Sequence, residues 1–285
     1  MKTINNKAQF WAISSEGMQR MATSSVPPQA EAIASANMAA SGDNKAQFLR
    51  DVFSIYFNQR KPMSITDGIA EVHMYGPMMA DASPIDLAMG GTSYEEIRAD
   101  IQAANDDESV NAILLVTDTP GGTVSGIEET YIEIKNSEKP VFGYNEGSAT
   151  SAGYYLIAAA ESIAVSQSSV TGNIGTVLDY WDLSEMYSQM GAERVVMTNE
   201  GADLKGTMRG PLTEDQAVFL QNQINSMGEQ FHERVKENRT DLDDEVYRAG
   251  WYGPKEAAAL GLVDYVGSKS EYREMIKSAV DIRKP

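Results

Sequence analysis

Strand-like and helix-like patterns alternate between residues 69 and 238, and this alternation limits the possible folds more than any other feature of the chain. Residues 69–75 alternate in polarity, which is typical of a strand. Residues 112–116 form a wholly apolar run, as expected for a strand that is buried on both faces. Helix-like segments stand between such runs. This order predicts an α/β fold with mostly parallel strands.

The remaining elements are predicted from shorter signals. Hydroxyl residues followed by Glu or Gln, at Ser93 and Thr213, predict helix starts, the second helix running to about Asn238. A helix face is predicted at Val124, Ile127, Tyr131 and Ile134. Further strands are predicted at 140–144, 162–165 and 194–197.

The composition excludes several classes of function. The 285 residues carry a formal charge of −18, which argues against binding to nucleic acid or to an anionic membrane surface. The chain has no Cys, so a thiol nucleophile, a Cys-bound zinc and a disulfide are excluded. No apolar run reaches about 18 residues, and no signal peptide is visible. We therefore expect a soluble cytoplasmic protein, and nothing implies a metal or an organic cofactor.

Three regions are expected along the chain. Residues 1–62 form an N-terminal extension rich in Ala, Ser, Met and Gln, partly helical or mobile, with a short amphipathic helix at 45–57. It carries no recognisable chemistry and is interpreted as an arm or packing segment. Residues 63–268 form the main domain, and residues 269–285 form a helical tail.

Ser151 is the strongest candidate for a catalytic residue. It lies among very small residues where an apolar helix pattern begins, so a substrate backbone can approach it. A helix start offers free N–H groups, here that of Ala152, which can stabilise an oxyanion. The two histidines, His73 and His232, are interpreted as solvated or edge residues. The base for Ser151 is therefore expected to be a lysine or a carboxylate.

The glycine turn contains Gly121 and Gly122. It belongs to the run Thr119-Pro120-Gly121-Gly122, which follows the buried strand predicted at 112–116. Ligands of open α/β folds collect at the carboxyl ends of strands, and paired glycines let a backbone N–H approach them closely. A Pro-Gly-Gly run is also an ordinary turn. Together with Ser151, however, it predicts a two-donor oxyanion hole, made by Ala152 and either Gly121 or Gly122.

Five segments, in order, resemble the signal peptide peptidase A family of serine peptidases, which includes the head-maturation proteases of tailed phages. They are residues 119–122, 151–155, 171–175, 201–206 and 253–264. The resemblance covers roughly residues 64–268. It implies the Clp protease/crotonase-like fold, built of repeated ββα units with mostly parallel sheets.

The resemblance implies a serine-type endopeptidase with a Ser-Lys dyad, in which Ser151 is the nucleophile and Lys205 the general base. A lysine acts as a base only when neutral, which burial favours. Asn173 stands where the family usually has a Ser that orients the lysine. Ser148 and Lys255 are weaker alternatives for the two catalytic roles.

The resemblance also implies partners. The phage branch cleaves scaffold, capsid or portal polypeptides within the assembling prohead, in the host cytoplasm. Family members form homo-oligomeric rings, and Ser and Lys can come from adjacent protomers. Three alternatives stay open: a cellular, protein-degrading relative of the signal peptide peptidases, an acyl-thioester enzyme of the same superfamily, and an assembly factor with an impaired dyad.

Overall fold

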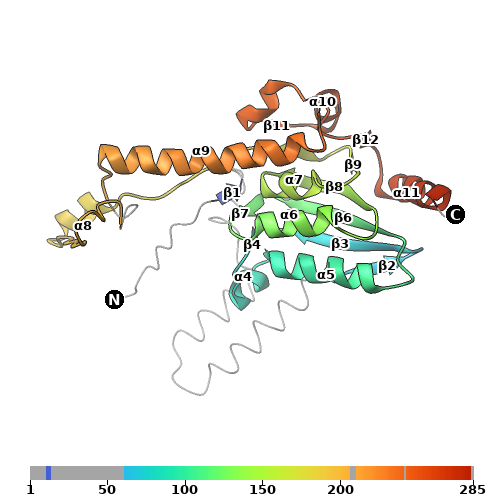
Figure 1. The fold of residues 1–285 in the computed structure, drawn as a ribbon, viewed down its shortest axis with the longest axis horizontal. Coiled ribbons are helices and arrows are strands. Elements are labelled where there is room, and N and C mark those ends of the chain that lie inside the picture. Colours follow the sequence, from blue (N-terminus) through green and yellow to red (C-terminus); the bar gives the residue numbers. More distant parts are fainter. Residues whose placement is uncertain (1–10, 14–60, 206–209, 241, 284–285) are drawn as a thin grey trace, which may run out of the picture.

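The computed structural model describes residues 11–13, 61–205, 210–240 and 242–283 (Figure 1). Its first half contains β1 (Trp11–Ile13), β2 (Ser64–Thr66), β3 (Ile69–Tyr75), β4 (Met78–Met79), α4 (Pro84–Ala88), β5 (Thr92–Ser93), α5 (Tyr94–Asp106), β6 (Ala112–Thr119), β7 (Gly121–Thr123), α6 (Ile127–Lys135) and β8 (Val141–Thr150). Its second half contains α7 (Ala152–Ile157), β9 (Ser162–Val165), β10 (Val170–Gly172), α8 (Ser184–Gln189), α9 (Glu214–Lys236), the 3₁₀ helix η1 (Asp244–Arg248), β11 (Trp251–Tyr252), α10 (Pro254–Ala259), β12 (Tyr265–Val266) and α11 (Lys269–Arg283).

The main sheet is mostly parallel. Its order is β11-β10-β8-β6-β3-β2, with β9 also paired to β8 and β12 to β9. Only the pairs β2–β3 and β10–β11 are antiparallel. A second, smaller sheet has the order β1-β7-β4-β5. The units β3-β4-α5 and β6-β7-α6 each place one strand in each sheet before a helix, which confirms the predicted architecture of repeated ββα units.

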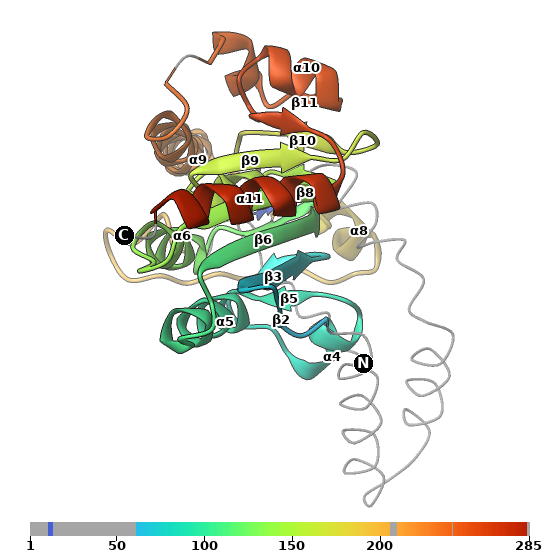
Figure 2. The same ribbon diagram turned by 90° about the vertical axis from the view of Figure 1, so that its right-hand side faces the viewer.

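Both faces of the main sheet are covered (Figure 2). The larger core cluster includes residues of α5, α6 and α7, and α11 contributes Tyr272, Ile276 and Val280 to a second cluster. Along β6, alternate residues join opposite clusters: Ile113 and Leu115 the first, Ala112, Leu114 and Val116 the second. This two-sided burial explains why residues 112–116 of β6 are continuously apolar.

Most of the predicted elements are confirmed. β3, β6, β8 and β9 occupy the predicted runs, and the caps at Ser93 and Thr213 begin α5 and α9. Thr213 and Gln216 form the complete capping box. The predicted helix at 45–57 lies outside the described residues. In the N-terminal extension, residues 11–13 form a strand of the smaller sheet.

The strand predicted at 194–197 is wrong. Residues 194–197 have no regular secondary structure and are exposed. β-branched residues favour a strand only where a neighbouring strand pairs with their backbone, and none of the described strands pairs with this segment. The segment belongs to the arm, defined here as residues 177–205, which includes α8. With the first turns of α9, the α8 region extends away from the body (Figure 1).

Candidate active site

Ser151 occupies a strained turn between β8 and α7. Its backbone has φ 56° and ψ −121°, a conformation that costs an L-residue roughly 1–3 kcal/mol. The turn is fixed from the neighbouring strand: the N–H of Ser151 donates to the carbonyl of Gly172 at 2.9 Å, and Gly172 pairs with Thr150. The sheet therefore holds the hydroxyl-bearing residue at its carboxyl edge, immediately before the first N–H groups of α7.

The small residues around Ser151 are required by packing. A Cβ on Gly153 would lie 2.5 Å from Cγ2 of Thr119. Ser151 itself is 1% exposed. Among the residues that the structure describes, none accepts or donates a hydrogen bond at its Oγ. The hydroxyl thus makes no structural hydrogen bond that chemistry would have to break.

The glycine turn lies beside α7, which we call the nucleophile helix because it directly follows Ser151, the predicted nucleophile. α7 packs against β7. Gly121 has φ 117°, and its N–H donates to Thr119 Oγ1 at 3.1 Å. An oxyanion would compete with Thr119 for this donor. A Cβ on Gly122 would lie 2.1 Å from the carbonyl oxygen of Met78, so Gly122 is needed for the close pairing of β7 with β4. The choice between the two donors stays a prediction, as does the role of Ala152.

Asn173 lies next to the residue that fixes Ser151. It directly follows Gly172, has φ 55°, and donates its backbone N–H to the carbonyl of Gly250 at 2.6 Å. The structure therefore places Asn173 near the serine turn, while its orienting role for a lysine stays a prediction. The alternative base, Lys255, is exposed on α10.

The interpretation of His73 as a solvated residue is wrong. His73 is buried in β3, beyond the residues of β3 that pair with β2, and its ring stacks on Tyr75 with 5.3 Å between centroids. Burial, aided by Lys61, lowers the pKa of His73 to about 4, so the side chain is neutral at pH 7. His232 is half-buried on α9, and burial lowers its pKa although a bond to the backbone of Ile174 opposes the shift. Neither histidine bonds Ser151.

Lys205 is far from Ser151 within one protomer. The lysine loop, defined here as residues 201–205, is attached to the start of α9. There, Gln216 Nε2 donates to the carbonyl of Asp203 at 2.9 Å. α9 reaches the nucleophile helix near Phe231, whose ring lies 4.9 Å from that of Tyr155. The helical rise puts these two points of α9 about 20 Å apart. The structure therefore does not bring the two predicted catalytic residues together in one chain.

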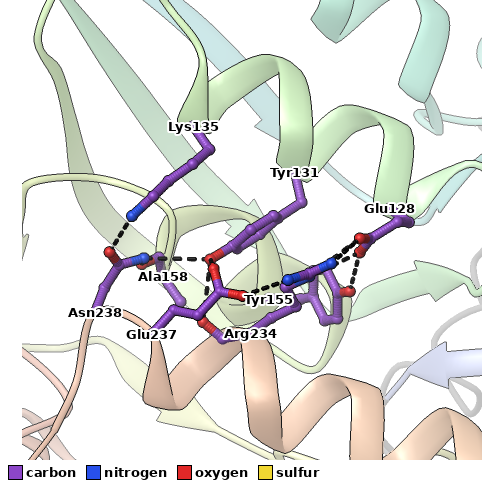
Figure 3. A network of polar contacts seen from close by, with 8 residues as sticks. All are labelled: Glu128, Tyr131, Lys135, Tyr155, Ala158, Arg234, Glu237 and Asn238. Carbon is purple, nitrogen blue, oxygen red and sulfur yellow. Dashed lines mark hydrogen bonds and ion pairs between the residues drawn. The ribbon is translucent and has the colours of Figure 1, made fainter.

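A polar network fixes α9 on the nucleophile helix (Figure 3). Tyr155 of α7 donates to Glu128 of α6 at 2.5 Å, and Arg234 of α9 donates to the same carboxylate at 3.0 Å through Nε. Burial alone would raise the pKa of Glu128, but the bonds from Arg234 and Tyr155 outweigh it and hold that pKa below its ordinary value. Tyr131 extends the network by donating to the carbonyl of Arg234 at 3.1 Å.

Sequence reasoning missed this network. Glu128 and Arg234 are 106 positions apart, and neither stands in a recognisable motif. The only local signal is an acidic residue in the first turn of α6, which is common in helices.

Comparison with known proteins identifies the family. The model of peptidase family S49 matches residues 133–283, more than half of the chain, and the matched part includes Ser151, Asn173 and Lys205. The chain belongs to peptidase family S49. The resemblance drawn from the sequence motifs is thereby confirmed.

Individual relatives fit this membership. Capsid assembly protease C of Escherichia phage lambda is 27% identical over 79% of this chain and 52% of its own length. Serine protease SPPA, chloroplastic, of Arabidopsis thaliana is 25% identical over 76% of this chain and 33% of that protein. The chain thus spans between a third and about half of these two S49 relatives. An enoyl-CoA hydratase structure from Shewanella pealeana covers 80% of the chain, and 77% of the hydratase is covered, at a TM-score of 0.45 and 11% identity.

The described residues contain neither a membrane-spanning helix nor a cluster of metal-ligating side chains. No helix among them combines the length and apolar character needed to cross a bilayer. Within the same ranges, no group of three or more His, Asp or Glu side chains is placed to hold a metal ion.

Proposed function

We propose that the chain is a serine endopeptidase whose Ser-Lys dyad is completed between protomers. The observation that carries the proposal is Ser151. A serine in a strained strand-to-helix turn, with a buried hydroxyl that no described group bonds, is costly in a purely structural role. The same arrangement suits a nucleophile, because the hydroxyl is held rigidly beside the unpaired N–H groups of a helix start.

In the proposed mechanism, the neutral amine of Lys205 from a neighbouring copy accepts the proton of Ser151 Oγ as the oxygen attacks the peptide carbonyl. The N–H of Ala152 and that of Gly121 or Gly122 stabilise the oxyanion. The lysine then returns the proton to the leaving amine, and water hydrolyses the acyl-enzyme with the lysine again as base. Asn173, beside the serine turn, orients the incoming amine.

The arm supports completion by a second copy. Several large apolar side chains of the arm are strongly exposed in the protomer, namely Trp181 (79%), Met190 (74%), Val195 (75%) and Met197 (90%). Exposed apolar surface of this kind marks an interaction site. The same arm includes the lysine loop. A contact that buries these side chains against a neighbouring copy would therefore also bring Lys205 close to Ser151 of that copy. A homo-oligomeric ring is the closed assembly that such head-to-tail contacts form.

For the substrate, we propose polypeptides of phage or prophage head assembly, such as scaffold, capsid or portal proteins. The support is the similarity to a capsid assembly protease of phage lambda. Cleavage would then take place in the host cytoplasm, inside the assembling prohead.

A fluorophosphonate probe tests the proposed function on the assembled full chain. We expect covalent labelling that is lost in Ser151→Ala and in Lys205→Ala. Ser148→Ala is the matched control, because it removes a hydroxyl three residues away, and it should still be labelled. An assembled wild-type protein that the probe does not label would instead favour the assembly factor.

A further inference from the structure

The smaller sheet contains a strand from the far N-terminal part of the chain. β1 pairs antiparallel with β7, with Trp11 opposite Thr123, Ala12 opposite Gly122 and Ile13 opposite Gly121 (Figure 1). Among the described strands, β1 pairs with β7 alone, since the order of this sheet is β1-β7-β4-β5. Without β1, β7 would present a free edge right beside the nucleophile helix that packs against it.

A free strand edge at this place fits an extended polypeptide. Peptide-binding proteins commonly add the bound segment as a strand to such an edge, through main-chain hydrogen bonds. β7 starts at the glycine turn, so a strand on its edge lies next to the predicted oxyanion donors. A substrate of the proposed peptidase that pairs with the edge of β7 would run past the glycine turn, next to the helix that follows Ser151.

β1 has the polarity that such a substrate needs. Because the pairing is antiparallel, the carboxyl-terminal residue of β1, Ile13, is opposite Gly121, at the glycine-turn end of β7. A chain with this direction leads its carbonyl groups toward the oxyanion site, as the residues before a scissile bond must.

We propose that Trp11–Ile13 is an internal occupant of the substrate edge, which competes with polypeptide substrates for β7. This inference rests on the proposed function in one respect: the ligand that competes with Trp11–Ile13 is called a substrate because the chain is proposed to be a peptidase. Because the segment is tethered to the domain, its effective concentration at β7 is on the order of millimolar. A substrate therefore binds well only after the segment is displaced.

The test removes the pairing and leaves the chain at full length. Prolines at two successive positions, Ala12→Pro with Ile13→Pro, must remove a ladder hydrogen bond, because successive N–H groups of a strand point to opposite sides. Ala22→Pro with Thr23→Pro is the matched control, since it places the same two prolines outside β1. Circular dichroism verifies that all variants stay folded.

The first readout does not depend on activity. In a Ser151→Ala background, a fluorescent peptide with the sequence of residues 8–17 is titrated and its anisotropy recorded. We expect the β1 variant to bind this peptide at least about fivefold more tightly than the parent and the control, as the tethered competitor is gone. Equal affinities in all three proteins would overturn the inference.

The second readout separates this inference from the proposed function. With the native Ser151, the β1 variant should hydrolyse a short peptide with a lower KM and an unchanged kcat. Hydrolysis with the same KM in the β1 variant and the control would refute the internal occupant while supporting the peptidase. Tighter peptide binding without any Ser151-dependent hydrolysis would support the occupant and refute the peptidase.

Discussion

At the scale of single residues, the site depends on backbone conformations that most residues avoid. Ser151 and Asn173 both have positive φ, and Gly121 and Gly172 have φ of 117° and 125°. These four residues lie around the same strand-to-helix turn, linked by the bond from Ser151 N–H to Gly172. Such clustering of strain is characteristic of functional sites, where the surrounding sheet holds the chain in place.

His73 yields a prediction of pH dependence. Its pKa is lowered to about 4 in the folded protein, mainly by burial, while an unfolded histidine titrates near 6.5. Between these values the unfolded state binds more protons, so the stability that neutral His73 provides is complete above pH 6.5 and is lost as the pH falls toward 4. From pH 7.5 to 5.5, we expect the free energy of unfolding to fall by about 1 kcal/mol through this residue.

Urea unfolding of wild type and His73→Gln at pH 7.5 and 5.5 measures this loss. The variant should lose less stability than wild type between the two pH values, because glutamine does not titrate. The charged groups around His73 that contribute to its pKa are Lys61, Glu71, Lys269 and Glu146, and they are unchanged in the variant. The same loss in both proteins would show that His73 is not the titrating group.

At the scale of elements, the network around Glu128 connects the two helices that matter most. Tyr155 belongs to the nucleophile helix α7, and Arg234 belongs to α9, whose other end carries the lysine loop. One carboxylate between them fixes the direction in which α9 leaves the body.

We expect Glu128→Gln to lower the free energy of unfolding by about 1–3 kcal/mol, because an amide cannot replace a partly buried charged acceptor that is bonded by both Arg234 and Tyr155. Glu129→Gln is the matched control: it removes the same charge from the next, exposed residue of α6 and should change stability by less than about 0.5 kcal/mol. Equal losses in chemical denaturation would mean that the network contributes nothing specific.

The elements also show how far the sequence predicts the fold. β3 was predictable from its alternating polarity and β6 from its continuous apolar run, because both patterns report burial against the rest of the same chain. Strands of two or three residues, such as β4, β7 and β11, are too short for any periodicity, and only their pairing defines them. The segment 194–197 has a strand-like composition but no partner strand in the part of the chain that the structure describes. The motifs indicated Ser151 and the glycine turn. The separation of Lys205 from Ser151 was not predictable from any local pattern, because it depends on where the two ends of α9 lie in the folded protein.

At the scale of the whole molecule, the proposed dyad is incomplete within one protomer. The body holds Ser151, the predicted oxyanion donors and Asn173, while Lys205 is attached to the far end of α9. The apolar side chains of the arm are exposed in the same region of the chain, at residues such as Val195 and Met197. Assembly and catalysis are therefore coupled in the proposed account: the contact that covers the arm also supplies the base.

The most direct test of this coupling is a complementation experiment with two inactive variants. Ser151→Ala and Lys205→Ala are prepared separately and as co-expressed mixed assemblies, and peptide hydrolysis is measured at matched assembly size. In mixed assemblies, a complete site forms wherever a Lys205→Ala protomer, which keeps Ser151, receives the native Lys205 of a Ser151→Ala neighbour. In an equal random mixture this occurs at about a quarter of the sites. We therefore expect about a quarter of the wild-type activity from the mixture and none from either variant alone. A mixture that assembles and stays as inactive as its components would contradict a dyad shared between protomers.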